Sequence, residues 1–197
     1  MDLDLKNIVA IVSVGMAMTG YWFYFKDIFA GKTKPHAFTW LIWATLTTIA
    51  FFGQQSDDAG AGAWVTAATA VISFAIFGLA LTKGEKDITR SDKIFLGASI
   101  LSIIPWLLTK DPLISIILVT IIDFLGFLPT IRKSIKKPYE ETLSTYVLSG
   151  LKFVLAIIAL DNYTLVTWLY PASLIVANWA FIVLLVIQRG KSKITSG

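Results

Sequence analysis

The chain alternates long apolar stretches with short polar segments rich in Gly, Pro and charged residues. The apolar stretches run for about 16 to 24 residues and lack the alternation of membrane β-strands. A helix of roughly 20 residues, rising about 1.5 Å per residue, crosses about 30 Å of hydrocarbon. The pattern therefore predicts seven transmembrane helices, at about residues 8–25, 37–53, 61–82, 94–109, 113–131, 143–160 and 164–187.

Composition points to the same class. Of the 197 residues, 56% are hydrophobic and only 15% are charged, and the mean hydropathy is +0.72. One soluble core of this size cannot bury so much apolar surface. We therefore expect an all-α integral membrane protein, with the lipid bilayer as its first partner.

The residue types present in the chain argue against several classes of site and activity, and we therefore do not expect them. The chain has no Cys and only one histidine, His36, so we expect neither a thiolate site nor a clustered metal centre. No nucleophile with a nearby base stands out, so an enzyme is not expected, and no cofactor is implied. A retinal protein needs a lysine deep in its final helix, and residues 164–187 contain none.

The basic residues predict an orientation. Fourteen of the 17 Lys and Arg residues fall in segments on one side of the seven expected helices. By the positive-inside rule the N-terminus is outside and the C-terminus cytoplasmic. Because these residues are spread over short loops at helix ends, no nucleic-acid partner is expected.

The chain also contains an internal repeat. At an offset of about 103, residues 32–43 (KTKPHAFTWLIW) align with residues 135–146 (IKKPYEETLSTY), and Gly20 aligns with Gly126 when small gaps are allowed. We interpret residues 1–84 and 112–190 as parallel three-helix repeats. Residues 85–111 hold the linker loop and fourth helix, and residues 191–197 form a cytoplasmic tail.

Two sequence motifs and the order of the helices carry a family resemblance. Residues 126–134 (GFLPTIRKS), followed by Glu141 and Ser144, resemble the PQ-loop pattern, with Thr130 in place of Gln. Trp40-Leu-Ile-Trp43 resembles a helix of PnuC-type vitamin transporters, and the 3+1+3 helix order is similar to that of SWEET transporters. The resemblance implies transport by alternating access, of a sugar or of a vitamin-like or nucleoside-like solute. Resemblance to the SWEET family implies that Asn178 is a solute contact, whereas its residue type is equally compatible with an interhelical hydrogen bond. Ser73 lies nearest the matching position of the third helix.

Two charges stand near the centres of expected helices. Asp123 lies in the fifth and Lys152 in the sixth. Each costs about 2.5 to 3.5 kcal/mol at that depth, so we expect both to face the bundle interior. Two readings stay open: a structural ion pair between neighbouring helices, or a site for solute or for proton coupling. The charges themselves favour an amino-acid-like or proton-linked solute.

Further candidates follow from helical spacing. Hydroxyl stripes include Thr69 and Ser73 on the third helix and Ser149 on the sixth, which either bind solute or serve close packing. Trp43 is one turn deeper than Trp40 and is the better candidate for stacking on a solute ring. Candidate hinges for alternating access are Gly126, Pro129 and Pro171. Glu140 and Glu141 are expected to favour the start of the sixth helix.

These features predict a transporter of a small polar solute, with its site at the interface of the two repeats. The substrate class stays open among sugars, vitamin-like or nucleoside-like solutes and amino-acid-like solutes, and self-association is left open. The alternative is a seven-helix receptor or scaffold that does not transport, in which Asp123 and Lys152 form a structural pair.

Overall fold

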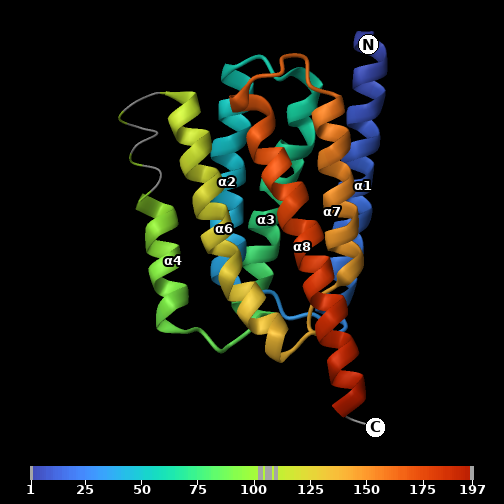
Figure 1. Ribbon diagram of the computed structural model, residues 1–197, viewed down its shortest axis with the longest axis vertical. Helices are drawn as coiled ribbons and strands as arrows, with labels where there is room; N and C mark the ends of the chain where they lie inside the picture. Colours follow the sequence, from blue (N-terminus) through green and yellow to red (C-terminus); the bar gives the residue numbers. More distant parts are fainter. Residues whose placement is uncertain (1, 102–103, 105–107, 109–110, 196–197) are drawn as a thin grey trace.

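The computed structural model describes residues 2–101, 104, 108 and 111–195, which are built from helices packed side by side (Figure 1). The described part of the chain contains seven α-helices, and the 3-10 helix η1 (Gly60–Ala63) leads directly into α3. The α-helices are α1 (Leu3–Phe29), α2 (Ala37–Ser56), α3 (Trp64–Lys83), α4 (Arg90–Leu101), α6 (Pro112–Lys136), α7 (Leu143–Ile158) and α8 (Leu165–Thr195).

Five of these helical segments are long and apolar enough to cross a membrane: α1, α2, η1 with α3, α6 and α8. Helix α7 is apolar but has 16 residues, and α4 is described over 12 residues. Large apolar side chains lie on the outside of the bundle, such as Trp22, which is 68% exposed, and Val71, which is 71% exposed. This combination is typical of an integral membrane protein, with lipid covering the outer face.

Each of the six central helices packs against at least two others. Helix α3 contacts both α1 and α2, and α8 contacts both α6 and α7. In addition, α1 packs against α7 and α2 packs against α6. Helix α4 contacts α6 and α2 at the side of the bundle (Figure 1).

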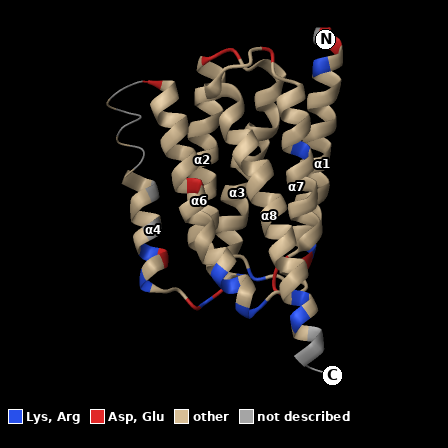
Figure 2. Ribbon diagram, viewed as in Figure 1, with Lys and Arg blue, Asp and Glu red and all other residues tan. Residues whose placement is uncertain are grey.

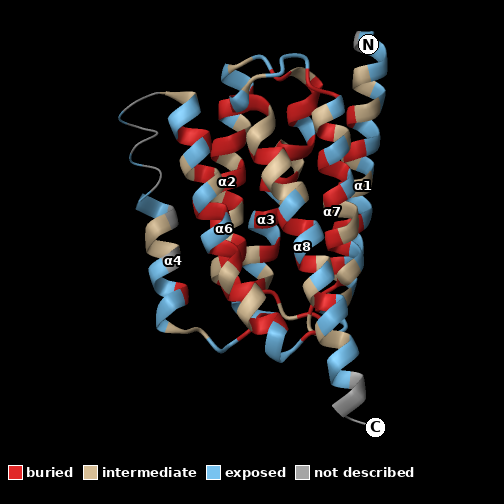
Figure 3. Cartoon of the chain, viewed as in Figure 1, coloured by how far each residue is buried: buried red, intermediate tan, exposed pale blue. Residues whose placement is uncertain are grey.

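Buried residues and basic residues occupy different parts of the bundle. Buried residues lie mainly on the faces that the helices turn toward one another (Figure 3). Lys and Arg gather at the end of the bundle where the C-terminus lies, and the N-terminus lies at the other end (Figure 2). We call the first of these the basic end.

The fourth helix differs from its expected bounds of 94–109. Helix α4 begins at Arg90 because Thr89 and Asp92 cap it reciprocally: the Thr89 backbone N–H donates to Asp92 Oδ2 at 2.8 Å, and the Asp92 N–H donates to Thr89 Oγ1 at 3.4 Å. Beyond Leu101, most of the expected helix lies outside the described residues. Helices α1, α6 and α8 extend by several residues into the basic segments that were expected to be loops.

Candidate functional site

A cavity of about 50 Å³ lies among six helices, α1, α2, α3, α6, α7 and α8. All the side chains that the sequence singled out for solute binding or proton coupling line it. These are Trp43, Thr69, Ser73, Asp123, Ser149, Lys152 and Asn178. The structure thus brings together residues that are up to 135 positions apart in the sequence. We call this space the central cavity.

Lys152 of α7 is fully buried at the wall of the central cavity. Its Nζ donates to Thr69 Oγ1 at 2.9 Å and to the Tyr21 hydroxyl at 3.0 Å. The ammonium also lies over the rings of Tyr21 and Phe153, 4.5 Å and 4.8 Å from their centroids. Hydrogen bonds and the negative faces of two aromatic rings therefore offset part of the cost of burying this charge.

Asp123 of α6 has different partners. The Tyr170 hydroxyl of α8 donates to Asp123 Oδ1 at 3.0 Å, and the same hydroxyl lies 3.2 Å from Thr47 Oγ1 of α2. Asp123 is 3% exposed. One hydrogen-bonded set thus joins α2, α6 and α8, whereas the Lys152 set joins α1, α3 and α7.

The two charges do not pair directly. Among the described residues, no ion pair joins Asp123 to Lys152. Each is held by hydroxyl groups of its own set, and both line the same cavity. The arrangement therefore offers a cation donor and a carboxylate acceptor to a molecule placed between them.

Other lining groups have unused hydrogen-bonding capacity. Trp43 Nε1 and Ser73 Oγ are buried without a hydrogen-bond partner among the described residues. Asn178 Nδ2 donates to the Leu174 carbonyl of its own helix at 2.7 Å. Buried polar atoms are normally hydrogen-bonded, so an unpaired donor and an unpaired hydroxyl in a cavity indicate room for a polar guest.

The size of the central cavity limits what it holds in this conformation. A single water needs about 10 to 15 Å³ by this kind of measure, so about 50 Å³ accommodates only a few water molecules. Sites for drug-sized ligands are roughly 300 to 1,000 Å³. Any larger solute therefore requires the surrounding helices to separate.

The sequence did not single out the tyrosines that hold the charges. Tyr21 begins the aromatic run Tyr-Trp-Phe-Tyr-Phe, which is typical of an interfacial belt, yet its hydroxyl meets Lys152 inside the bundle. Tyr170 directly precedes Pro171 and carries no motif. Aromatic residues also crowd the lining, where Trp43 makes edge contacts with Trp40 and with Phe127, at centroid distances of 5.0 Å and 5.1 Å. Trp43 is thus already packed against rings.

A buried charged cluster around Glu141 adjoins the central cavity through Tyr146, which lines it. Glu141, 2% exposed, accepts hydrogen bonds from Lys133, from Tyr24 at 3.3 Å and from Tyr146 at 2.8 Å. Trp40, which lines the cavity, donates from Nε1 to the Tyr24 hydroxyl at 3.2 Å. Glu141 directly precedes the N-cap residue of α7, but among the described residues its carboxylate binds a lysine and two tyrosines and makes no capping hydrogen bond.

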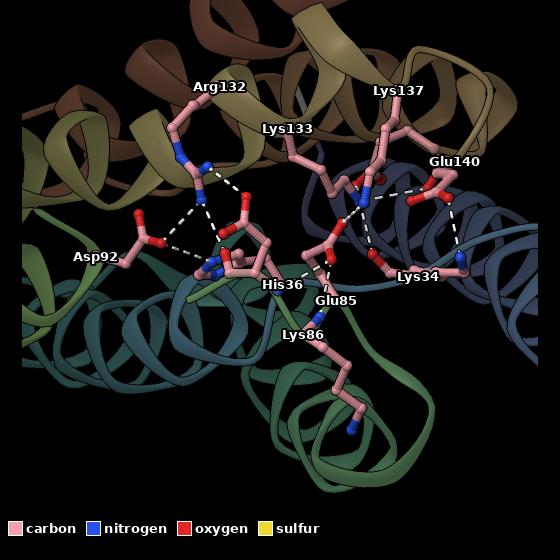
Figure 4. Close-up of polar contacts among 11 residues, drawn as sticks. Lys34, His36, Glu85, Lys86, Asp92, Arg132, Lys133, Lys137 and Glu140 are labelled. Carbon is pink, nitrogen blue, oxygen red and sulfur yellow. Dashed lines mark hydrogen bonds and ion pairs between the residues drawn. The ribbon is translucent and has the colours of Figure 1, made fainter. Parts of the chain in front are cut away.

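A second charged cluster lies at the basic end itself (Figure 4). The Arg132 guanidinium reaches Asp92 Oδ2 at 3.0 Å, and His36 Nε2 lies 3.2 Å from the same oxygen. Lys137 donates to Glu85 at 2.8 Å. These contacts tie the start of α4 and the segment before it to the end of α6.

The pKa of the Glu85 carboxyl differs strongly from its ordinary value. Burial alone raises the pKa of Glu85, but the hydrogen bonds from Lys137 Nζ and from the next two backbone N–H groups outweigh burial. The net result lowers the pKa of Glu85 to about 2. The Glu85 to Lys137 contact therefore stays charged at every physiological pH.

The candidate hinges lie in different settings. Pro129 and Pro171 are inside α6 and α8, and both helices continue past them. Gly126 lies where α6 meets α2, and a Cβ atom there would come within 2.5 Å of Ile42 Cγ2. Gly126 is thus required for close packing of these two helices. Its role as a hinge stays a prediction.

Comparison of the chain with protein-family models, with curated proteins and with solved structures finds no match. The case for function therefore rests on the geometry of the cavity and its charged surroundings.

Proposed function

We propose that this chain is a membrane transporter that moves a small polar solute by alternating access, with the central cavity as the solute site. The observation that carries the proposal is that Asp123 and Lys152, an acid and a base deep in apolar helices, line one cavity without pairing with each other. Charges at such depth are costly and are typically found along solute or ion pathways. In this scheme Asp123 binds a cationic group or a proton, and Lys152 binds an anionic group.

The remaining lining groups suit a hydrogen-bonding solute. Trp43 Nε1 and Ser73 Oγ are free to contact it, Thr69 and Ser149 add hydroxyl groups, and Asn178 lines the same wall. The two charges favour an amino-acid-like or proton-linked solute. The resemblance to the 3+1+3 transporters favours a sugar or a vitamin-like or nucleoside-like solute instead.

Alternating access is proposed to come from two three-helix repeats that move against each other. The packing supports this, because α3 lies between α1 and α2 as α8 lies between α6 and α7. Close approaches repeat as well: Gly20 of α1 packs against Thr145 and Leu148 of α7, and Gly126 of α6 packs against Ile42 of α2. Ile42 and Thr145 are separated by the offset of about 103 that relates the two halves of the sequence.

In the proposed topology all seven helices span the bilayer, the N-terminus is outside and the basic end is cytoplasmic. The buried cluster around Glu141 then closes the central cavity on the cytoplasmic side. Helix-interior prolines weaken the hydrogen-bond ladder, so Pro129 and Pro171 are the proposed hinge points, with Gly126 between the repeats.

Counterflow uptake in proteoliposomes tests the proposal. The panel contains labelled sugars, amino acids and vitamin precursors, each measured with and without an inward proton gradient. Accumulation of one class is the expected result. Asp123→Asn abolishes gradient-driven accumulation and preserves exchange at equal pH if Asp123 carries the proton.

The matched control is Asp4→Asn, which changes an exposed carboxylate at the far end of α1 and leaves uptake unchanged. Folding of each variant is checked by its elution profile and thermal stability in detergent. Folded protein that is silent across the panel contradicts the transport proposal and favours the receptor or scaffold alternative.

A further inference from the structure

A second hollow lies on the side of the bundle, between α4 and α6. Its volume of about 420 Å³ is within the range of roughly 300 to 1,000 Å³ that is typical of ligand sites. Its lining divides into an apolar group, Leu128, Pro129, Ile131 and Ile135, and a polar group, Ser91, Asp92, Arg132 and Lys136. None of these residues lines the central cavity, so we call this space the lateral groove.

Along α6 the deepest part of the groove wall is apolar, and the charged residues lie nearer the basic end. Helix α6 runs toward the basic end, so Leu128 is eight residues, or about 12 Å, deeper along the helix than Lys136. Ser91 and Asp92 belong to the first turn of α4, which starts at the basic end. The groove is therefore apolar at its deep end, from Leu128 to Ile131, and mixed toward the basic end, where Ile135 lies between Arg132 and Lys136. This order suits an amphipathic molecule whose long axis runs along the helices.

At the polar end of the lateral groove the charges are two cations, Arg132 and Lys136, and two carboxylates, Asp87 and Asp92, both of which pair with Arg132. The Arg132 guanidinium is fixed by Asp87 at 3.1 Å and by Asp92 at 3.0 Å, and its side chain remains 27% exposed. Lys136 is exposed and has no ion-pair partner among the described residues. A fixed guanidinium beside a free ammonium is suited to a phosphate group.

We propose that the lateral groove binds one anionic phospholipid of the phosphatidylglycerol type. The phosphate lies against Arg132 and Lys136 beside Ile135, and the upper part of one acyl chain follows Ile131 and Leu128 toward the middle of the bundle. The phosphate of an anionic headgroup supplies a counter-ion to Lys136, whereas a zwitterionic headgroup brings a cation of its own to the same place. The site shares no residue with the central cavity, and its link to the transport proposal is Pro129, a proposed hinge that lines the groove. Lipid binding is therefore tested without a transport measurement.

Native mass spectrometry of the full chain, released from detergent with added lipid, tests this. Phosphatidylglycerol is expected to remain bound as a single molecule at concentrations where phosphatidylcholine and phosphatidylethanolamine do not. Lys136→Gln is expected to weaken phosphatidylglycerol binding roughly fivefold, because it removes one cation beside the phosphate. Ile135→Trp, at a half-exposed position between Arg132 and Lys136, is expected to fill the groove where the phosphate lies and to weaken binding at least as much.

The control is Lys26→Gln, which removes an exposed lysine at the basic end outside the groove. Equal losses in Lys136→Gln and Lys26→Gln overturn the proposal, since they indicate general attraction to a basic surface. Unchanged binding in Ile135→Trp overturns it too, and so does equal retention of all three lipids.

Discussion

The side chain of Gln54 in α2 donates from Nε2 to the backbone carbonyl oxygen of Thr167 in α8, at 2.9 Å. Thr167 is four residues before Pro171, so its carbonyl lacks the helical N–H that it would otherwise receive. Gln54 is fully buried and supplies the missing donor from a neighbouring helix. The proline and the glutamine thus form one structural unit.

This unit predicts an interaction between two substitutions. Gln54→Met keeps the side-chain volume but leaves the Thr167 carbonyl unpaired, and we expect it to lower the free energy of unfolding by about 1 to 3 kcal/mol. Pro171→Ala restores a backbone N–H, so Gln54→Met is expected to cost less in that background. A double-mutant cycle on denaturant unfolding in detergent measures the difference. Equal costs in both backgrounds contradict the interpretation.

Close packing at Gly126 predicts a steric effect. Gly126→Ala places a methyl group within 2.5 Å of Ile42 Cγ2, and we expect a loss of about 1 to 3 kcal/mol in unfolding free energy from overpacking. Gly78→Ala is the control, because a Cβ at Gly78 meets nothing within 4 Å and alanine favours a helix. Adding Ile42→Ala to Gly126→Ala is expected to recover part of the loss.

The residues of the central cavity could be selected from the sequence because depth in a helix and spacing along one face are local properties. Asp123, Lys152 and the hydroxyl stripe through Thr69 and Ser73 were selected in that way. The hydrogen-bond partners of these residues could not be selected from the sequence, because the contact of Tyr21 with Lys152 depends on how α1 and α7 are rotated against each other. Local periodicity does not encode that rotation.

The same reasoning explains what the sequence did not reveal elsewhere in the chain. The start of α4 was placed too late because Thr89 and Asp92 lie in a charged segment that has no apolar periodicity. Glu141 was read only as a helix-start residue because Pro138 precedes it closely, although its partners Tyr24 and Lys133 come from other helices. Neither the cap at the start of α4 nor the buried position of Glu141 can be predicted without knowing which residues meet in three dimensions.

The hydrogen bonds of Lys152 and those of Asp123 involve different residues. This separation predicts which pairs of substitutions have additive effects on uptake. Tyr21→Phe and Thr69→Val each remove a hydrogen-bond partner of Lys152 Nζ. The effect of the double variant on exchange uptake is therefore expected to differ from the sum of the effects of the two single variants. Tyr21→Phe and Tyr170→Phe act on different sets and are expected to add within about 0.5 kcal/mol of transition-state free energy. Strong coupling of Tyr21 with Tyr170 contradicts the separation.

The Glu85 to Lys137 contact predicts a pH dependence of stability. The pKa of Glu85 is lowered to about 2 in the folded protein, so its stabilising effect is complete above the unfolded value of about 4.3 and is lost as pH falls toward 2. Wild-type protein is therefore expected to melt higher than Glu85→Gln at pH 7, and this gap should narrow between about pH 4 and pH 2. Melting curves in detergent measure it, and a gap independent of pH contradicts the assignment.

The buried contact of Lys133 with Glu141 predicts both a stability effect and an accessibility effect. Glu141→Gln leaves a buried ammonium without its counter-ion, and we expect it to destabilise the protein by about 3 to 5 kcal/mol. Lys133→Met combined with Glu141→Leu removes both charges and is expected to restore most of that stability.

If the cluster around Glu141 closes the central cavity at the basic end, the stable double variant also opens that end more often, because the tyrosines lose the carboxylate that joins them. The chain has no cysteine, so Ser73→Cys gives a single thiol inside the cavity. A membrane-impermeant thiol reagent applied from the basic side should label Ser73→Cys faster in the double variant than in the otherwise unchanged chain. Equal labelling rates, with both proteins folded, would show that closure of the cavity at this end depends on other contacts, such as the rings of Trp40 and Trp43.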